Sequence, residues 1–134
     1  VITFEELMGM FVGKGIDLAA IETDNVVNDC SAIGRGFAQA GGVAGAVQAY
    51  IKEIEPEREL MLEAADGLHD CVKLARLAKA GKKNGYLIEG MGCPGGCIAG
   101  AGTLAPYNKA QKALNNFMKA AEYQSPTQNP LLDK

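Results

Sequence analysis

The segment from residue 90 to residue 102 constrains this chain more than any other. It reads Gly-Met-Gly-Cys-Pro-Gly-Gly-Cys-Ile-Ala-Gly-Ala-Gly and carries Cys93 and Cys97. Glycine is favoured where the backbone must bend or come close to another group. The segment belongs to an uncharged stretch, Gly90–Tyr107, but its glycine and proline content excludes a membrane-spanning helix. It therefore predicts a close-packed loop that presents two thiols.

The residue spacing in this loop is compatible with two kinds of binding site. Gly90-Met-Gly-Cys-Pro-Gly95 satisfies the G-x-G-x-x-G pattern after a predicted strand, which is typical of dinucleotide binding. That fingerprint also needs a second strand that ends in an acid about 20 residues later. Here a helix is predicted over Lys109–Lys119, and Glu122 is the one acid nearby. The pattern therefore disfavours a dinucleotide site.

The cysteine pair favours an iron–sulfur site. If Gly95 begins a helix, both sulfurs lie at its N-terminal end, one turn apart. There the helix dipole and free N–H groups favour thiolates. The small residues around the pair leave room for a bulky group, and amides without side-chain cover can bond to sulfide. Two cysteines supply only half of the four ligands of a cubane cluster.

Apolar periodicity and turn residues predict an α/β fold, a small and mostly parallel sheet with flanking helices. Strands are expected over Glu57–Ala65 and Tyr86–Glu89, with a helix over Leu68–Ala80 between them. A strand–helix–strand unit implies parallel pairing. Before this unit, the sequence predicts a helix over Thr3–Gly13 that opens with a Thr3/Glu6 capping box, a short helix over Asp17–Ile21, a loop over Thr23–Gly36 and a helix from Gly41 to about Glu53. After it, a helix is expected from Tyr107 to about Tyr123, with Phe117 facing inward. A tail over Ser125–Pro130 follows.

Composition excludes several classes of protein. Thirteen basic residues against 16 acidic give a formal net charge of −3, which argues against a nucleic-acid groove. Hydrophobic residues make up 48% of the chain and charged residues 22%, which argues against disorder. Four cysteines without a secretory signal point to a reducing, cytoplasmic compartment. A chain that begins at Val1 without a methionine suggests a segment of a longer protein.

Three segments resemble one enzyme family. Glu89-Gly-Met-Gly-Cys-Pro-Gly-Gly-Cys97-Ile-Ala-Gly-Ala-Gly is similar to the last cysteine motif of FeFe (iron-only) hydrogenases, Glu-x-Met-x-Cys-x-Gly-Gly-Cys-x-x-Gly-Gly-Gly. Phe37-Ala-Gln-Ala-Gly-Gly-Val43 resembles the family's Phe-Gly-x-Thr-Gly-Gly-Val. Ser125-Pro-Thr-Gln-Asn-Pro-Leu-Leu132 resembles its Ser-Pro-x-x-Asn-Pro ending. The resemblance implies that residues 1–134 form the C-terminal lobe of an iron-only hydrogenase catalytic domain.

The resemblance also implies a cofactor and residue roles. These oxidoreductases interconvert dihydrogen with protons and electrons at an H-cluster. In this cluster a 4Fe–4S cubane is joined through a cysteine sulfur to a two-iron unit with CO, cyanide and a dithiolate. By position, Cys93 is expected to bind the cubane and Cys97 to bridge the two parts. Met91 and Phe37 are expected to line the two-iron pocket, where an apolar wall suits low-valent iron.

Other family features are missing from this chain. The family's upstream Cys-Cys-Pro and Pro-Cys-x-x-Lys-x-Glu motifs, with two cubane cysteines, a lysine and a proton-relay cysteine, do not occur. The isolated chain is therefore expected to hold no complete cluster and to evolve no hydrogen. Its implied partners are the N-terminal lobe of the same parent chain and ferredoxin or a similar electron carrier, with no nucleic acid and no membrane. Ala38, Ala40 and Ala101 depart from the family pattern and suggest a divergent subgroup.

Several alternatives remain open. The parent could be a non-catalytic iron–sulfur assembly or hydrogen-sensing protein of the same family, or an interaction domain with a redox-active Cys93–Cys97 pair. Cys30 and Cys71 lack motif context and are interpreted as structural or free thiols. His69 is not at a zinc spacing, and a four-cysteine zinc site would need long-range assembly. Glu89 could accept N–H bonds as a structural group or help to move protons, and the structural role is favoured.

Overall fold

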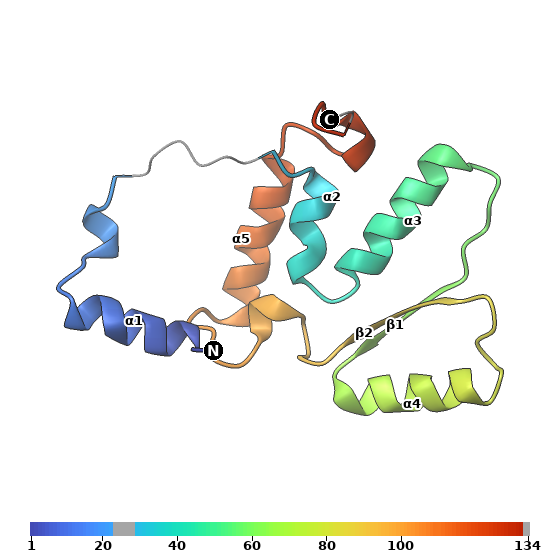
Figure 1. Cartoon of the computed structure of the whole chain (residues 1–134), viewed down its shortest axis with the longest axis horizontal. Helices are drawn as coiled ribbons and strands as arrows, with labels where there is room; N and C mark the ends of the chain where they lie inside the picture. The colour runs from blue at the N-terminus through green and yellow to red at the C-terminus, as the bar shows by residue number, and fades with distance from the viewer. Residues whose placement is uncertain (23–28, 133–134) are drawn as a thin grey trace.

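The computed structural model describes residues 1–22 and 29–132 and shows a small α/β arrangement (Figure 1). Two parallel strands, β1 (Leu62–Asp66) and β2 (Leu87–Met91), are joined by α4 (Leu68–Lys79). The predicted strand–helix–strand unit and the fold class are thereby confirmed. The sheet lies between α4 and another helix, α3 (Gly42–Ile54), as Figure 1 shows.

The parallel register sets which side chains face each helix. Asp66 at the end of β1 is opposite Met91 at the end of β2. Since side chains alternate along a strand, neighbours on β2 face opposite sides of the sheet. Gly90 faces α4, where a Cβ added to it would lie 3.3 Å from the Cys71 sulfur. Glu89 faces α3 and accepts a hydrogen bond from the Ala44 amide.

The strand over Glu57–Ala65 was predicted too long at its start. The Arg58 amide donates to the Glu55 carbonyl at 3.0 Å, so a turn occupies the residues after Pro56. Pairing then begins at Leu62, because β2 offers only five residues as partners. β2 itself extends two residues beyond the predicted end at Glu89.

The loop predicted over Thr23–Gly36 is wrong in its second half. Residues 23–28 lie outside the described part of the chain. α2 (Ala32–Arg35) begins within the predicted loop, and a 3₁₀ turn, η2 (Gly36–Ala38), follows α2 directly. Ser31 caps α2 by accepting a hydrogen bond from the Gly34 amide at 3.1 Å.

The last helix, α5 (Tyr107–Lys119), lies beside α2 and ends before the predicted Tyr123 (Figure 1). The Tyr123 carbonyl accepts a hydrogen bond from the Ala32 amide at 2.7 Å. Tyr123 therefore serves the start of α2 and does not extend α5. Phe117 is 44% exposed, because its ring is covered on one face by a guanidinium and not by the core.

Arg35 joins α2 to α5. Its buried guanidinium donates to the Phe117 carbonyl at 2.6 Å and to the Cys30 carbonyl at 3.2 Å. Its Cζ also lies 4.2 Å from the centre of the Phe117 ring. One side chain therefore satisfies a carbonyl near the end of α5 and fixes the position of α2.

Replacing Arg35 with alanine is expected to destabilise the chain by about 3 kcal/mol, because charge-assisted hydrogen bonds and a cation–π contact are lost together. Urea unfolding followed by circular dichroism measures the change. Arg76→Ala, on an exposed position of α4, is the matched control and should change stability by less than about 0.5 kcal/mol. Equal effects of the two substitutions would contradict this role of Arg35.

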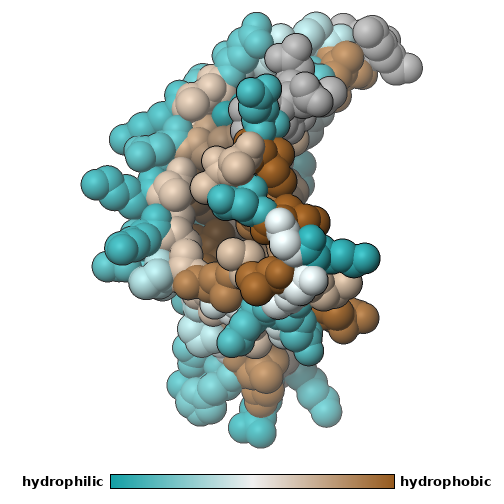
Figure 2. All heavy atoms as spheres, turned by 90° about the vertical axis from the view of Figure 1, so that its left-hand side faces the viewer, coloured by the Kyte–Doolittle hydropathy of each residue, from teal (hydrophilic) through white to brown (hydrophobic). Residues whose placement is uncertain are grey.

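The N-terminal arm projects away from the other helices. α1 (Phe4–Gly13) opens with the predicted capping box, in which the Thr3 hydroxyl accepts from the Glu6 amide and the Glu6 carboxylate accepts from the Thr3 amide. The predicted short helix is the 3₁₀ turn η1 (Leu18–Ala20), capped by Asp17. Figure 2 shows apolar side chains at the surface on this side of the molecule. The exposed apolar residues of the arm include Phe4, Met8, Met10, Val12, Ile16 and Leu18.

The hydrophobic core is small and consists mainly of alanine. Among the described residues no large side chain is fully buried, and the buried apolar side chains are Ala32, Ala44, Ala46, Ala65, Leu74 and Ala121. Many large apolar side chains stay exposed, which is typical of a surface that contacts further protein. Within residues 1–22 and 29–132, no helix has the length and hydrophobicity to cross a bilayer.

The C-terminal tail packs onto the helices. η4 (Pro126–Gln128) is capped by Ser125, which is buried. The Thr127 hydroxyl donates to the Glu53 carboxylate near the end of α3, and the Asn129 side-chain Nδ2 donates to the Asp29 carbonyl at 2.6 Å. The tail therefore fastens the end of α3 to the segment before α2.

This contact makes tail docking depend on pH. Hydrogen bonds from Ser125 and Thr127 hold the pKa of the Glu53 carboxyl below its ordinary value. A lowered folded-state pKa stabilises the docked tail above the unfolded pKa of about 4.3, and the stabilisation is lost as pH falls through the folded value. Amide exchange of residues 125–129 should rise in this acidic range. Glu53→Gln should flatten the pH dependence, and an unchanged profile in that variant would refute the assignment.

Candidate functional site

The candidate site is the loop that follows β2. The Gly96 amide donates to the Cys93 carbonyl at 2.9 Å and closes a four-residue turn. Pro94 occupies the second position of this turn and Gly95, with φ +85°, the third, which is the pattern of a type II turn. The turn begins at Cys93 and is followed directly by Cys97, and both cysteines are exposed free thiols.

The expectation that Gly95 begins a helix is wrong. Gly95 and Gly96 both have positive φ, and Gly96 (φ +88°, ψ −166°) lies in a region that is essentially restricted to glycine. An α-helix cannot pass through these two residues. A single 3₁₀ turn, η3 (Cys97–Ala99), follows instead, so an extended helix dipole does not act on the cysteines. The dinucleotide interpretation fails for the same reason, since its fingerprint opens a helix directly after the strand.

The backbone around the sulfurs carries little side-chain cover. A Cβ added to Gly100 would lie 3.8 Å from the Cys93 sulfur, so Gly100 borders this thiol. The Gly100 amide donates to the Cys97 carbonyl at 3.2 Å, which folds η3 back toward the turn. Two exposed thiols on a loop of small residues offer the type of donor that binds an iron–sulfur cluster.

A second segment packs directly against this loop. A Cβ added to Gly96 would lie 2.6 Å from the Ala40 nitrogen and 2.7 Å from the Ala38 oxygen. The Ala40 amide also donates to the Gly95 carbonyl at 3.4 Å. The turn that contains Phe37, together with Ala40 after it, therefore meets the cysteine loop, backbone against backbone. Phe37 itself is 48% exposed.

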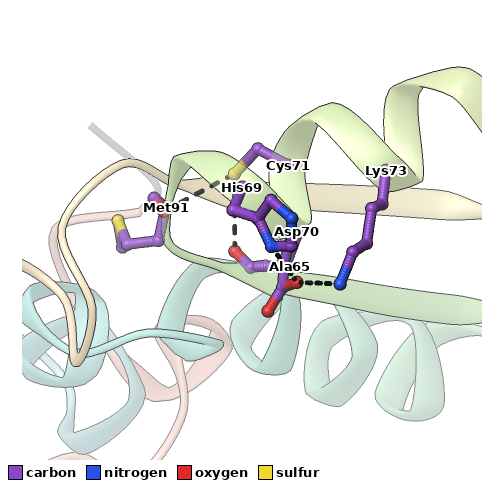
Figure 3. A network of polar contacts seen from close by, with 6 residues as sticks. All are labelled: Ala65, His69, Asp70, Cys71, Lys73 and Met91. Atoms are coloured by element: carbon purple, nitrogen blue, oxygen red, sulfur yellow. Dashed lines mark hydrogen bonds and ion pairs between the residues drawn. The ribbon is translucent and has the colours of Figure 1, made fainter.

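Met91 connects the end of β2 to α4. Its carbonyl accepts a hydrogen bond from the Gly67 amide at 2.8 Å and lies 3.5 Å from the Cys71 sulfur. Figure 3 shows the Cys71 thiol between the carbonyls of Ala65 and Met91. The half-buried Met91 side chain lines a groove between β2 and α3. Phe37 and Cys93 are exposed, whereas Met91 is only partly so.

The remaining candidate ligands lie apart from the loop. Cys71 is half-buried and bonded to carbonyls, as expected for a structural thiol. His69 contacts Asp70 at 3.5 Å, and Lys73 holds the pKa of the Asp70 carboxyl below its usual value (Figure 3). Across residues 1–22 and 29–132, no three histidine, cysteine or acidic side chains gather as a metal site. The four-cysteine zinc interpretation therefore has no support within these ranges.

One residue of the site, Asp66, was not predicted from the sequence. The Gly95 amide donates to the Asp66 carboxylate at 2.9 Å, so the end of β1 holds the turn between the two cysteines. The sequence did offer a signal for Asp66: it is an acid at the carboxyl end of β1, and β1 is parallel to β2, the strand that leads into the loop. Carboxyl ends of parallel strands share one edge, where ligand sites in α/β folds are found.

A comparison with known protein families finds a match for this chain. The family model of the iron only hydrogenase large subunit, C-terminal domain, matches residues 1–101. The matched range includes both the turn at Phe37 and the cysteine loop, whereas the tail from Ser125 lies beyond it. No curated protein matches the chain.

Proposed function

Because the chain belongs to the family formed by the C-terminal domain of the iron-only hydrogenase large subunit, we propose that it is one lobe of a domain that interconverts dihydrogen with protons and electrons. In this proposal Cys93 ligates a 4Fe–4S cubane and Cys97 bridges it to a two-iron unit. Phe37 and Met91 line the two-iron pocket.

One observation carries the proposal. The Gly96 backbone packs on the backbone of Ala38 and Ala40, so two resembling segments that are more than 50 residues apart meet at one place. That place presents two exposed thiols and an exposed aromatic side chain. Thiolates are the usual protein ligands of iron–sulfur clusters, and the donor set therefore fits the group.

The chain's own residues have distinct tasks in this proposal. Cys93 and Cys97 bind as thiolates, which requires both to lose a proton on loading. Phe37 and Met91 exclude water without offering an exchangeable proton. Asp66 and the glycine turn hold the two sulfurs in place. When bound, the cluster would supply redox-active iron at which dihydrogen is interconverted with protons and electrons, and the external electron carrier would deliver or remove those electrons.

Two thiolates do not complete the cubane. The other ligands, a proton relay and the second wall of the pocket must come from the N-terminal lobe of the parent chain. Ferredoxin or a similar carrier is the proposed electron partner. The cysteine usage favours a cytoplasmic compartment, and the resemblance to the family implies an anaerobic setting. The isolated chain is expected to be inactive for the same reason.

Anaerobic production of the parent protein together with its maturation machinery tests the proposal. Stoichiometric iron and hydrogen evolution from a chemical reductant are expected for the parent, and neither for the isolated chain. A colourless, metal-free parent would overturn the assignment.

The second candidate is a non-catalytic iron–sulfur assembly or hydrogen-sensing member of the family. Ala38 and Ala40, which depart from the family pattern, contribute the backbone atoms that touch Gly96. A divergent pocket is compatible with a sensor. Stoichiometric iron without hydrogen turnover in the same assay would support this candidate.

A further inference from the structure

The Glu89 carboxylate links the sheet to α3. Its Oε2 accepts a hydrogen bond from the Ala44 amide at 2.9 Å, across 45 residues of sequence. The residue before α3 is Gly41, which offers no side chain to cap the helix. The first amides of a helix lack partners within the helix, and an acceptor oxygen placed there satisfies one of them. Glu89 thus replaces the missing cap from a different element.

The start of α3 is in turn rigidly joined to the cysteine loop. A Cβ added to Gly42 would lie 2.0 Å from the Gly36 oxygen, so the first residue of α3 presses on the turn that contains Phe37. The same segment packs against Gly96, where an added Cβ would lie 2.6 Å from the Ala40 nitrogen and 2.7 Å from the Ala38 oxygen. Both joints are backbone contacts, which cannot adjust by rotating a side chain. A displacement of the start of α3 is therefore transmitted to the turn between Cys93 and Cys97.

We propose that Glu89 is a positioning residue for the metal pocket: it fixes the start of α3 to β2 and thereby sets Phe37 and the cysteine loop in one arrangement. The inference rests on the proposed function for the identity of the pocket. The anchoring itself rests on the geometry of this chain.

The surroundings of the second carboxylate oxygen indicate which feature of Glu89 holds the start of α3. Oε1 is buried and has no hydrogen-bond partner among the described residues. No group in this part of the chain pairs with the charge, so the essential feature is one acceptor oxygen directed at the Ala44 amide. Glutamine keeps such an oxygen in a side chain of the same shape, whereas alanine removes it.

The test compares Glu89→Ala and Glu89→Gln in the full-length parent protein, with Glu57→Ala, an exposed acid of the same chain, as the control. Amide exchange of residues 42–45 is measured before iron loading. Bound iron and the electron paramagnetic resonance spectrum of the reduced protein are measured afterwards. Glu89→Ala should speed exchange of the Ala44 amide about tenfold or more and lower bound iron, with an altered spectrum of the iron that remains. Glu89→Gln should match the wild type in all three measurements, as should Glu57→Ala.

Two results would overturn the inference. One is a Glu89→Ala protein with wild-type exchange, iron and spectrum. The other is a Glu89→Gln protein that fails as badly as Glu89→Ala, which would assign the effect to charge and not to the hydrogen bond. A wild-type parent without iron would instead overturn the proposed function, and the exchange measurement would still decide whether Glu89 anchors α3.

Discussion

Cys97→Ser in the parent protein should abolish hydrogen turnover and strip most of the bound iron. Serine offers a hard oxygen in place of a soft thiolate, which iron–sulfur clusters require. Loss of a group that merely supports a metal ligand costs about 10–100-fold in affinity or activity. Loss of the proposed bridging ligand should therefore exceed a hundredfold. Iron analysis and hydrogen evolution from a chemical reductant measure both effects.

Cys30→Ser is the matched control for this substitution. Cys30 is also an exposed free thiol, but it lies before α2, outside the cysteine loop. The control protein should keep its iron and its activity. Cys93→Ser should lose both, as Cys97→Ser does. A Cys97→Ser protein with stoichiometric iron and normal turnover would remove Cys97 from the metal site.

Gly96→Ala should destabilise the chain by about 3 kcal/mol or more. A residue with a Cβ is strained by about 1–3 kcal/mol at the φ of +88° and ψ of −166° found here. The added Cβ would also lie 2.6 Å from the Ala40 nitrogen and 2.7 Å from the Ala38 oxygen, and these backbone atoms can yield only if the turn moves. Chemical unfolding of the chain measures the loss, and the parent carrying the substitution should also bind less iron.

Gly45→Ala provides the same chemical change at a permissive position. Gly45 lies inside α3, and a Cβ added there meets nothing within 4 Å. Alanine should stabilise this helix by about 0.5–1 kcal/mol. The two substitutions are therefore expected to differ in sign. Equal effects would mean that the contact between Gly96 and the turn at Phe37 is not tight in solution.

Local patterns predicted most of the helices. The capping box at Thr3, the glycines before α3 and Pro106 before α5 placed three starts within about one residue of those observed. Prediction failed where stability comes from distant parts of the chain. α2 lies in a polar, glycine-containing stretch, and it is held by Arg35 and by the Tyr123 carbonyl, both of which bond across more than 80 residues. No pattern within residues 23–36 reveals those partners.

The conformation of the cysteine loop was not predicted from the sequence. The motif identified Cys93 and Cys97, and the glycines indicated a tight loop, yet the expected helix from Gly95 does not form. A glycine is compatible with both helical and left-handed backbone, so its presence cannot distinguish a helix start from a turn. In the folded chain, the packing of Gly96 on Ala38 and Ala40 favours the turn over the helix.

The amino-acid sequence was sufficient to predict the strand–helix–strand unit, the family and the two thiols, because these depend on periodicity and on a short contiguous motif. How the cysteine loop and α3 are anchored became apparent only from the folded chain. Asp66 lies 29 residues from the turn that it holds, and Glu89 lies 45 residues from the helix that it caps. Hydrogen-bond acceptors act over about 3 Å in space, whatever their separation along the chain, so such anchors become visible only once packing has brought their partners together.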